Sequence, residues 1–209
     1  MNIKVCGITS LEQFEELAAL QVDYAGFIFY EKSPRFVSGK INPQLLRKNK
    51  EIIKTGVFVD EDANKLQRYV EEYDLDAVQL HGNESVEYMR FLPKDILKIK
   101  AIKIGQQDAD EIQAQLDSYA GVIDFYLLDT QTESVGGSGK KFNWEILKQL
   151  TFPLPFFLSG GISADDANTL QTLASSFPML HAVDINSRFE TSPGIKDIKQ
   201  IKQFKDAIS

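Results

Sequence analysis

Short apolar runs alternate with amphipathic segments along almost the whole 209-residue chain. Eight of the runs are rich in β-branched and aromatic residues and predict β-strands. Several are apolar on both faces, which is typical of parallel strands that helices cover. The predicted strands are Ile3–Cys6, Tyr24–Phe29, Lys54–Val59, Ala77–Leu80, Leu97–Ile102, Phe125–Leu128, Pro155–Leu158 and Leu180–Asp184.

The segments between these strands carry apolar residues at helical spacing. Ser10 and Ser163 each precede such a segment, and serine is a favoured residue at a helix N-cap. The predicted helices are Leu11–Leu20, Pro43–Lys50, Asp62–Tyr73, Ser85–Phe91, Asp108–Asp117, Trp144–Leu150, Ala164–Ser175 and Asp197–Ala207.

Eight strands, each followed by a helix, predict an α/β fold of the (β/α)8 TIM-barrel type. A doubly wound open sheet is the alternative, and the strand count argues against it. No linker, composition shift or low-complexity tract divides the chain. We therefore expect residues 1–209 to form a single, compact barrel domain.

The chain is acidic, because 23 Lys and Arg residues against 30 Asp and Glu residues give a formal net charge of −7. Such a chain does not attract nucleic acid or an anionic membrane through its overall field, so neither is an expected partner. A small phosphorylated substrate is still compatible, since a local nest of backbone N–H groups can hold phosphate.

The single cysteine excludes an intrachain disulfide and a metal site built from several thiolates. The two histidines and the carboxylates show no metal-ligand spacing, so no metal is expected. The first residues run directly into a predicted strand without an apolar signal region. No apolar run approaches the roughly 20 residues needed to cross a bilayer. These features favour a cytoplasmic protein.

In a barrel of this kind the chemistry takes place in the loops after the carboxyl ends of the strands. Cys6 ends the first predicted strand and precedes Gly7. A thiolate is a good base and nucleophile when its pKa falls below the free value of about 8.5. A buried structural cysteine is the alternative, and position alone leaves both readings open.

Asp129 follows the apolar run of the sixth predicted strand. A carboxyl group there could give or take a proton, while a loop or capping role is the alternative. Cys6 and Asp129 at opposed strand ends would form an acid–base pair across the barrel mouth. The sequence does not show the distance between them.

Two other strand ends suggest anion binding. Arg35, in Ser33-Pro34-Arg35, presents a planar fork that matches carboxylate or phosphate, with a solvated loop arginine as the alternative. Gly160 and Gly161 follow the seventh strand and precede a helix, where glycine admits a ligand and a helix N-terminus favours an anion. Because phosphate sites after strands seven and eight are frequent in this fold, phosphate is favoured over a plain turn.

The remaining motifs favour structural roles. The run from Val135 to Lys140 resembles a nucleotide-binding P-loop but lacks its spacing, so a flexible glycine-rich lid is the simpler interpretation. His81 follows the fourth strand and is expected to be a hydrogen-bonded structural residue, with substrate binding as the weaker alternative. His181 lies inside the eighth strand, far from its end. The carboxylates from Asp60 to Asp62 predict a loop and a helix cap rather than a cation site.

Taken together, the strand ends resemble the phosphoribosylanthranilate isomerase family of tryptophan biosynthesis. The matching stretches occur in order along nearly the whole chain. The first two stretches, combined with the others in the same order, are highly specific for this family. They are Lys4-Val5-Cys6-Gly7-Ile8-Thr9, Gly26–Phe29 with Ser33-Pro34-Arg35, Gly56–Val59, Val78–Gly82, Leu128-Asp129, Gly136–Gly139 before Phe142-Asn143-Trp144, Ser159–Ile162, Asp184–Glu190 and Pro193–Asp197.

The resemblance implies a TIM-barrel isomerase that performs the Amadori rearrangement of N-(5-phosphoribosyl)anthranilate to 1-(2-carboxyphenylamino)-1-deoxyribulose 5-phosphate. No cofactor is implied, because the hydrogen shift is internal to the substrate. The implied residues are Cys6 as general base, Asp129 as general acid, Arg35 for the anthranilate carboxylate, and Gly160, Gly161, Asn186, Ser187 and Arg188 for the phosphate.

These residue types suit the implied chemistry. Protonated Asp129 would give a proton to the ribose ring oxygen and open the ring to a Schiff base. Cys6, as thiolate, would remove the C2 proton and leave an enolamine that tautomerises to the ketone. Burial alone would raise the pKa of Cys6, so its thiolate needs positive charge or N–H donors that the sequence does not identify.

Two positions depart from the family pattern. Arg188 stands where glycine is usual, and arginine tolerates a positive φ poorly. Asn143 replaces the usual aspartate at a predicted cap. Family members occur as monomers and dimers, so the resemblance leaves a monomer or a homodimer open.

Three other functions compete with this interpretation. A ribulose-phosphate epimerase would need metal-binding His and Asp residues at strand ends, and the chain has only two His. An indole-glycerol-phosphate synthase would need catalytic Lys and Glu at strand ends, which are not found in that arrangement. A barrel that only binds a phosphorylated metabolite would need neither Cys6 nor Asp129.

Overall fold

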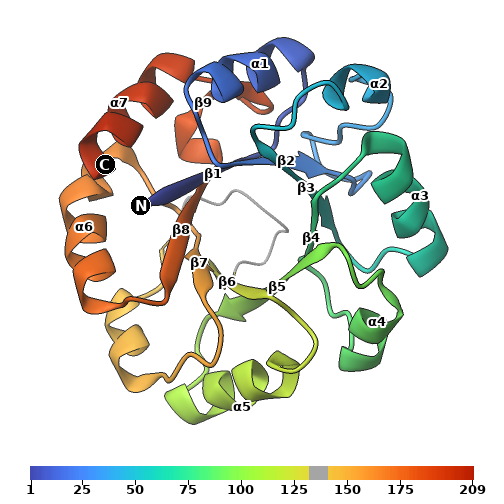
Figure 1. Ribbon diagram of the computed structural model, residues 1–209. Helices are drawn as coiled ribbons and strands as arrows, with labels where there is room; N and C mark the ends of the chain where they lie inside the picture. Colours follow the sequence, from blue (N-terminus) through green and yellow to red (C-terminus); the bar gives the residue numbers. More distant parts are fainter. Residues whose placement is uncertain (132–140) are drawn as a thin grey trace.

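The barrel predicted from the sequence is confirmed. The computed structural model describes residues 1–131 and 141–209, and within them eight parallel strands form a closed barrel in the order β1 to β8. Helices surround the strand ring (Figure 1). The strands are β1 (Asn2–Cys6), β2 (Tyr24–Ile28), β3 (Ile53–Phe58), β4 (Ala77–Leu80), β5 (Leu97–Ile104), β6 (Phe125–Thr130), β7 (Phe156–Leu158) and β8 (Leu180–Ile185).

The helices begin at polar caps, as the sequence predicts. Ser10 accepts a hydrogen bond from the Gln13 amide at the start of α1, and Asp62 caps α3 in the same way. No helix among residues 1–131 and 141–209 is long and apolar enough to cross a membrane. The helices are α1 (Leu11–Ala19), α2 (Pro43–Leu46), α3 (Ala63–Tyr73), α4 (Val86–Phe91), α5 (Ala109–Tyr119), α6 (Ala167–Ser176) and α7 (Ile198–Ile208), with 3-10 turns η1 (Trp144–Gln149), η2 (Ala164–Asp166) and η3 (Ser187–Phe189).

Three helix predictions are corrected. The helix predicted over Pro43–Lys50 is the short α2, because the Asn49 side chain accepts hydrogen bonds from the amides of Glu51 and Ile52 and so turns the chain. The segment predicted as Trp144–Leu150 is a 3-10 helix. The helix predicted over Ala164–Ser175 divides into η2 and α6.

A small antiparallel hairpin after β8 is absent from the sequence prediction. Its strands are β9 (Glu190–Ser192) and β10 (Ile195–Lys196). Gly194, at φ +85°, makes the turn between them. The hairpin carries Glu190 and Lys196 back toward the carboxyl ends of β1 and β2. The glycine-rich segment Gly136–Gly139 lies outside the described residues.

The core has two parts because successive strand residues face opposite sides of the sheet. The larger part packs between the strands and the helices, and Val5, Phe27 and Leu128 belong to it. The smaller part consists of Tyr24, Ala77, Ile99, Ala101, Leu127, Phe157 and Ala182, which pack together from six strands inside the barrel. An apolar barrel interior leaves the carboxyl ends of the strands as the place for chemistry.

His181 lies against this interior cluster although it directly precedes the interior residue Ala182, because the pairing of β7 with β8 shifts register at this point. Its Nε2 is 2.7 Å from the Tyr24 hydroxyl, and its ring packs against Phe125 and Phe157. Burial lowers the pKa of His181, with Asp23 acting in the opposite direction. The folded barrel therefore favours the neutral ring.

The pH dependence of stability follows from this shift. The pKa is lower in the folded state, so the stability linked to neutral His181 is complete above the unfolded value of about 6.5. It is lost as the pH falls through the folded-state value. We expect the free-energy advantage of the wild type over His181→Gln to shrink between about pH 7.5 and about pH 5.5. Urea unfolding at both pH values measures it, and an advantage that is constant or grows on acidification contradicts the prediction.

Candidate active site

Cys6 ends β1 and faces the adjacent strand β2 at Gly26. A Cβ atom on Gly26 would lie 3.0 Å from the Cys6 sulfur and 2.9 Å from its Cα. The glycine therefore makes room for the thiol, and the register pairs the same two residues. Cys6 is 5% exposed, so its environment is set by neighbouring side chains rather than by bulk water.

The charges around Cys6 act on its pKa in both directions. Burial raises the pKa of Cys6, the positive charges of Lys4 and Lys196 lower it, and the carboxylate of Asp184 raises it. The net shift is upward. Lys4 and Lys196 are thus the nearby cations whose charges lower the pKa of Cys6. Lys4 could have been found from the sequence, because it lies two residues before Cys6 and must face the same side of the strand.

Asp129 belongs to β6, which runs two residues beyond its predicted end at Leu128. One carboxylate oxygen accepts the Thr130 amide at 2.9 Å, and the other lies 3.1 Å from His81 Nε2. The two contacts fix both oxygens of the carboxylate, so the group is held in one orientation at the barrel mouth.

His81 follows β4 and links Asp129 to the barrel interior. Its Nδ1 lies 2.9 Å from Gln79 Nε2. Both ring nitrogens thus have a polar partner, Gln79 at Nδ1 and Asp129 at Nε2. His81 is therefore hydrogen-bonded, as the sequence analysis expects. Its partner is the predicted general acid, which the sequence could not show.

Gly160 and Gly161 have φ values of +91° and +66°, which favour glycine. A Cβ atom on Gly160 would lie 2.8 Å from the Thr130 amide nitrogen and 3.0 Å from an Asp129 carboxylate oxygen. This position requires glycine for two reasons: its φ is positive, and a side chain would collide with Thr130 and Asp129. From the sequence Gly160 is predicted to bind phosphate alone, and its contact with the predicted acid is an additional constraint.

Arg35 is held by Glu190 of the β9–β10 hairpin. Arg35 Nε lies 2.9 and 3.1 Å from the two Glu190 oxygens, and one terminal nitrogen lies 2.6 Å from Oε2. Hydrogen bonding to Glu190 raises the pKa of Arg35, which burial opposes. Arg35 is therefore a fixed, buried cation rather than the solvated loop arginine considered as an alternative.

Lys196 completes this cluster. Its ammonium lies 2.7 Å from Glu190 Oε1 and 2.8 Å from Asn186 Oδ1. Burial raises the pKa of Glu190, but Arg35 and Lys196 lower it more, and the net shift is downward. Glu190 and Lys196 were missed as functional candidates. Both lie in stretches that match the family, but their pairing with Arg35 depends on a hairpin that the sequence did not predict.

The loop after β8 contains the other predicted phosphate residues. Asn186 lies beside Gly7, since a Cβ atom on Gly7 would be 2.9 Å from Asn186 Oδ1. Ser187 and Arg188 form the turn η3. Arg188 is not among the described residues with positive φ, so the strain expected for arginine at a usual glycine position does not arise. Its side chain is exposed.

The predicted residues thus form two groups on the same rim of the barrel. Gly7 connects Cys6 with Arg35 and Asn186, because a Cβ atom on Gly7 would also lie 2.7 Å from Arg35 Cδ. On the other side, Gly160 and His81 contact Asp129. A base, an acid and two anion-binding elements around one mouth can act on a phosphorylated sugar that also carries a carboxylate.

Two structural predictions near this rim are confirmed. Asp62 caps α3 through the amides of Asn64 and Lys65, as expected of a cap rather than a cation site. Asn143 caps η1 through the Glu145 amide. In the part of the chain that the structure describes, no three His, Cys, Asp or Glu side chains come together as metal ligands.

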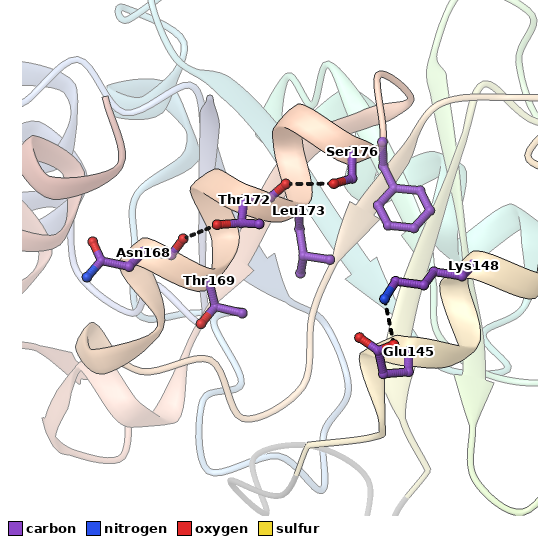
Figure 2. A pocket seen from close by; sticks show the side chains of 8 residues that line it. Glu145, Lys148, Asn168, Thr169, Thr172, Leu173 and Ser176 are labelled. Carbon is purple, nitrogen blue, oxygen red and sulfur yellow. Dashed lines mark hydrogen bonds and ion pairs between the residues drawn. The ribbon is translucent and has the colours of Figure 1, made fainter.

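A separate pocket of about 400 Å³ lies outside the barrel, between η1 and α6 (Figure 2). Four of its polar side chains already have partners: Glu145 pairs with Lys148 at 2.6 Å, and Thr172 and Ser176 donate to carbonyls of their own helix. It contains none of the predicted site residues. The lining residues are Glu145, Lys148, Asn168, Thr169, Thr172, Leu173, Ser176 and Phe177.

Comparisons with known proteins agree with this geometry. Residues 3–207 match the family model described as "N-(5'phosphoribosyl)anthranilate (PRA) isomerase". N-(5'-phosphoribosyl)anthranilate isomerase of Parabacteroides distasonis is 39% identical over 207 residues, which cover 98% of this chain and 91% of that protein.

Two solved structures are similar over their whole length. One is the structure of monomers generated from the dimeric phosphoribosylanthranilate isomerase of Thermotoga maritima. Its TM-score is 0.79 at 30% identity, and the match covers 100% of this chain and 98% of that one. A phosphoribosyl anthranilate isomerase in complex with reduced 1-(o-carboxyphenylamino)-1-deoxyribulose 5-phosphate has a TM-score of 0.78 at 29% identity, with the same coverage.

The contact between Gly160 and Asp129 predicts a selective loss of activity. In Gly160→Ala the new methyl group clashes with the hydroxyl and amide of Thr130 and with the Asp129 carboxylate that this amide holds, so the carboxylate shifts. A displacement of about 1 Å can lower a rate about 100-fold. Gly39→Ala is the matched control, because Gly39 has a φ of +78° but no atom within 4 Å of its Cβ position. Thermal melts and steady-state kinetics compare the two variants. If Gly160→Ala loses no more activity than Gly39→Ala, the contact does not position Asp129.

Proposed function

This chain belongs to the N-(5'-phosphoribosyl)anthranilate isomerase family, and on that premise we propose how its barrel mouth performs the reaction. The protein is an isomerase of tryptophan biosynthesis that rearranges N-(5'-phosphoribosyl)anthranilate to the corresponding 1-deoxyribulose derivative. The catalytic roles that follow rest on the placement of Cys6 and Asp129 at the ends of β1 and β6, on one rim of the barrel.

Asp129 is the general acid. It donates a proton to the ribose ring oxygen, the bond between that oxygen and C1 breaks, and the anilino nitrogen forms a Schiff base. The Thr130 amide and His81 hold the two carboxyl oxygens, which supports a fixed direction of transfer. His81 acts through Asp129 in this scheme, and its location at the mouth also allows a contact with the substrate.

Cys6 is the general base. Its thiolate takes the proton from C2 of the Schiff base, and the electron pair of the C–H bond forms the enolamine double bond. The enolamine then tautomerises to the ketone. The sulfur is buried, and nearby positive charge opposes the upward effect of burial on its pKa, which supports a role as a base. No electron leaves the substrate, so the scheme uses no redox cofactor.

Binding is assigned to the two ends of the substrate. Glu190 is bound by Nε and one terminal nitrogen of Arg35. The other terminal nitrogen of Arg35 binds the anthranilate carboxylate. The phosphate binds the backbone amides of Gly160 and Gly161, where positive φ values open the backbone to a ligand. Asn186, Ser187 and Arg188 complete the phosphate site from the loop after β8.

Further expectations accompany this proposal. Residues 1–209 act as one catalytic unit that works on a small phosphorylated substrate, either as a monomer or as a homodimer. A cytoplasmic location is supported by the biosynthetic role of the family and by a free thiol at Cys6.

The acid and base roles predict the effect of removing either group. We expect Cys6→Ala and Asp129→Asn to lower kcat about 100- to 10,000-fold, as is usual when a positioned acid or base is lost. The assay follows the fluorescence decay of freshly made phosphoribosylanthranilate. Asp110→Asn, an exposed position on α5, is the control and keeps full activity. No turnover by the wild type, or full turnover by Cys6→Ala, contradicts the proposal.

The role of Arg35 predicts a different pattern. Lysine retains the positive charge but lacks the fork that contacts Glu190 and a carboxylate together. We expect Arg35→Lys to raise KM about ten-fold or more, the cost of a lost charged hydrogen bond, with a smaller fall in kcat. Arg47→Lys, at an arginine that contacts the carbonyl of Glu71, leaves both constants unchanged. An unaltered KM in Arg35→Lys shows that Arg35 does not bind the substrate.

A further inference from the structure

Lys4 is a buried lysine inside the barrel that the mechanism above does not use. It lies on β1 two residues before Cys6, so both side chains face the barrel interior. Lys4 has no exposed surface. Burying a charged side chain costs free energy unless the charge is paired.

The partner is Asp184 of the adjacent strand β8. The register pairs Lys4 directly with Asp184, and the ammonium lies 2.9 Å from Asp184 Oδ1. The second carboxylate oxygen accepts the Ser159 hydroxyl at 3.3 Å. Three neighbouring strands thus fix the ammonium on the inner wall, directly below the thiol in the same strand.

Two other buried lysines show that Lys4 is placed differently. Lys54 pairs with Asp74 at 3.0 Å, and Lys100 pairs with Glu84 at 2.8 Å. Both follow interior residues in their strands and therefore face outward, toward the helices. Stability alone does not explain a charge pair inside the barrel, because well-packed apolar residues usually do as well as a buried ion pair or better.

We propose that Lys4, held by Asp184, is a positioning residue whose ammonium supplies the positive charge that stabilises the Cys6 thiolate. The inference deepens the proposed function, since it rests on Cys6 as the general base. During proton transfer from C2 the thiolate becomes a thiol and Lys4 keeps its own proton. Lys4 therefore changes the ease of forming the base and does not itself carry the proton.

The other charges facing Cys6 are less suited to this role. They are Asp184 from β8, Lys196 from β10 and Arg35 from the loop after β2. Burial lowers the pKa of Lys196, and its ammonium is shared between Glu190 and Asn186. Burial also acts on Lys4, but Asp184 and Cys6 raise the pKa of Lys4 above its ordinary value. Arg35 is bound to both oxygens of Glu190. Lys4 therefore combines a retained charge with the strongest lowering effect on the pKa of Cys6.

The test is a titration of the thiol itself. Cys6 is the only cysteine, so the ultraviolet absorbance of the thiolate, with Cys6→Ser subtracted, reports this one group. We expect Lys4→Met to move the midpoint up by about one pH unit or more, the usual effect of losing an opposite charge at close range. The thiolate fraction near neutral pH then falls about ten-fold, and kcat falls with it and recovers at higher pH.

Two variants separate charge from structure. Lys4→Arg keeps the charge and is expected to restore most of the shift. Lys54→Met removes an equally buried lysine that faces away from Cys6, so it lowers the unfolding midpoint but leaves the thiolate midpoint in place. If Lys54→Met shifts the titration as much as Lys4→Met does, the effect is structural and the inference is overturned.

Lys4→Met leaves Asp184 without its cation and can fail to fold. The double variant Lys4→Gln with Asp184→Asn removes both charges and leaves no unpaired ion. Because Lys4 acts on Cys6 more strongly than Asp184 does, this variant is still expected to shift the midpoint upward, by less. An unchanged midpoint overturns the inference.

The titration also distinguishes this inference from the proposed function. A shifted midpoint in a protein that has no isomerase activity supports the role of Lys4 and contradicts the proposed function. An active wild type whose thiolate midpoint is the same in Lys4→Met contradicts the role of Lys4 and leaves the function intact.

Discussion

The pairing of β1 with β8 is the constraint on which the rest of the structure depends. This pairing closes the barrel, and it places Lys4 directly opposite Asp184. The same register puts Cys6 at the rim beside the loop after β8, which contains Asn186. A slip of β1 by one residue would turn Lys4 and Cys6 toward the helices, away from Asp184 and the barrel mouth. Closure and the candidate chemistry therefore depend on one register.

The rim is built by charges that hold one another in place. Glu190 is shared by Arg35 and Lys196, Asp184 holds Lys4, and His81 holds Asp129. Buried ion pairs add little stability compared with apolar packing, so their presence at one end of the barrel is better explained by function. They fix charged groups where the proposed substrate has a carboxylate, a phosphate and two protons to move. The apolar interior at the opposite end supplies the packing that such a rim lacks.

Much of this structure could be predicted from the sequence. Alternating apolar runs indicate the strands, and glycines with positive φ occur where the predicted phosphate loop needs them, at Gly160 and Gly161. The partners of these groups could not be predicted. Arg35 and Glu190 are far apart in the chain and meet through a hairpin too short to leave a hydrophobic pattern. The contact of His81 with Asp129 likewise depends on the curvature of the barrel, which local periodicity does not encode.

The central claim, that the Cys6 thiolate is the base, is tested most directly by comparing two pH profiles of the wild-type protein. One is the ultraviolet titration of its single thiol, and the other is kcat/KM, which reports the ionisation of the free enzyme. Because burial raises the pKa of Cys6, log(kcat/KM) should rise with a slope of about 1 through neutral pH and level off at the midpoint of the thiolate titration. A rate that levels off while Cys6 is still a thiol would contradict the account.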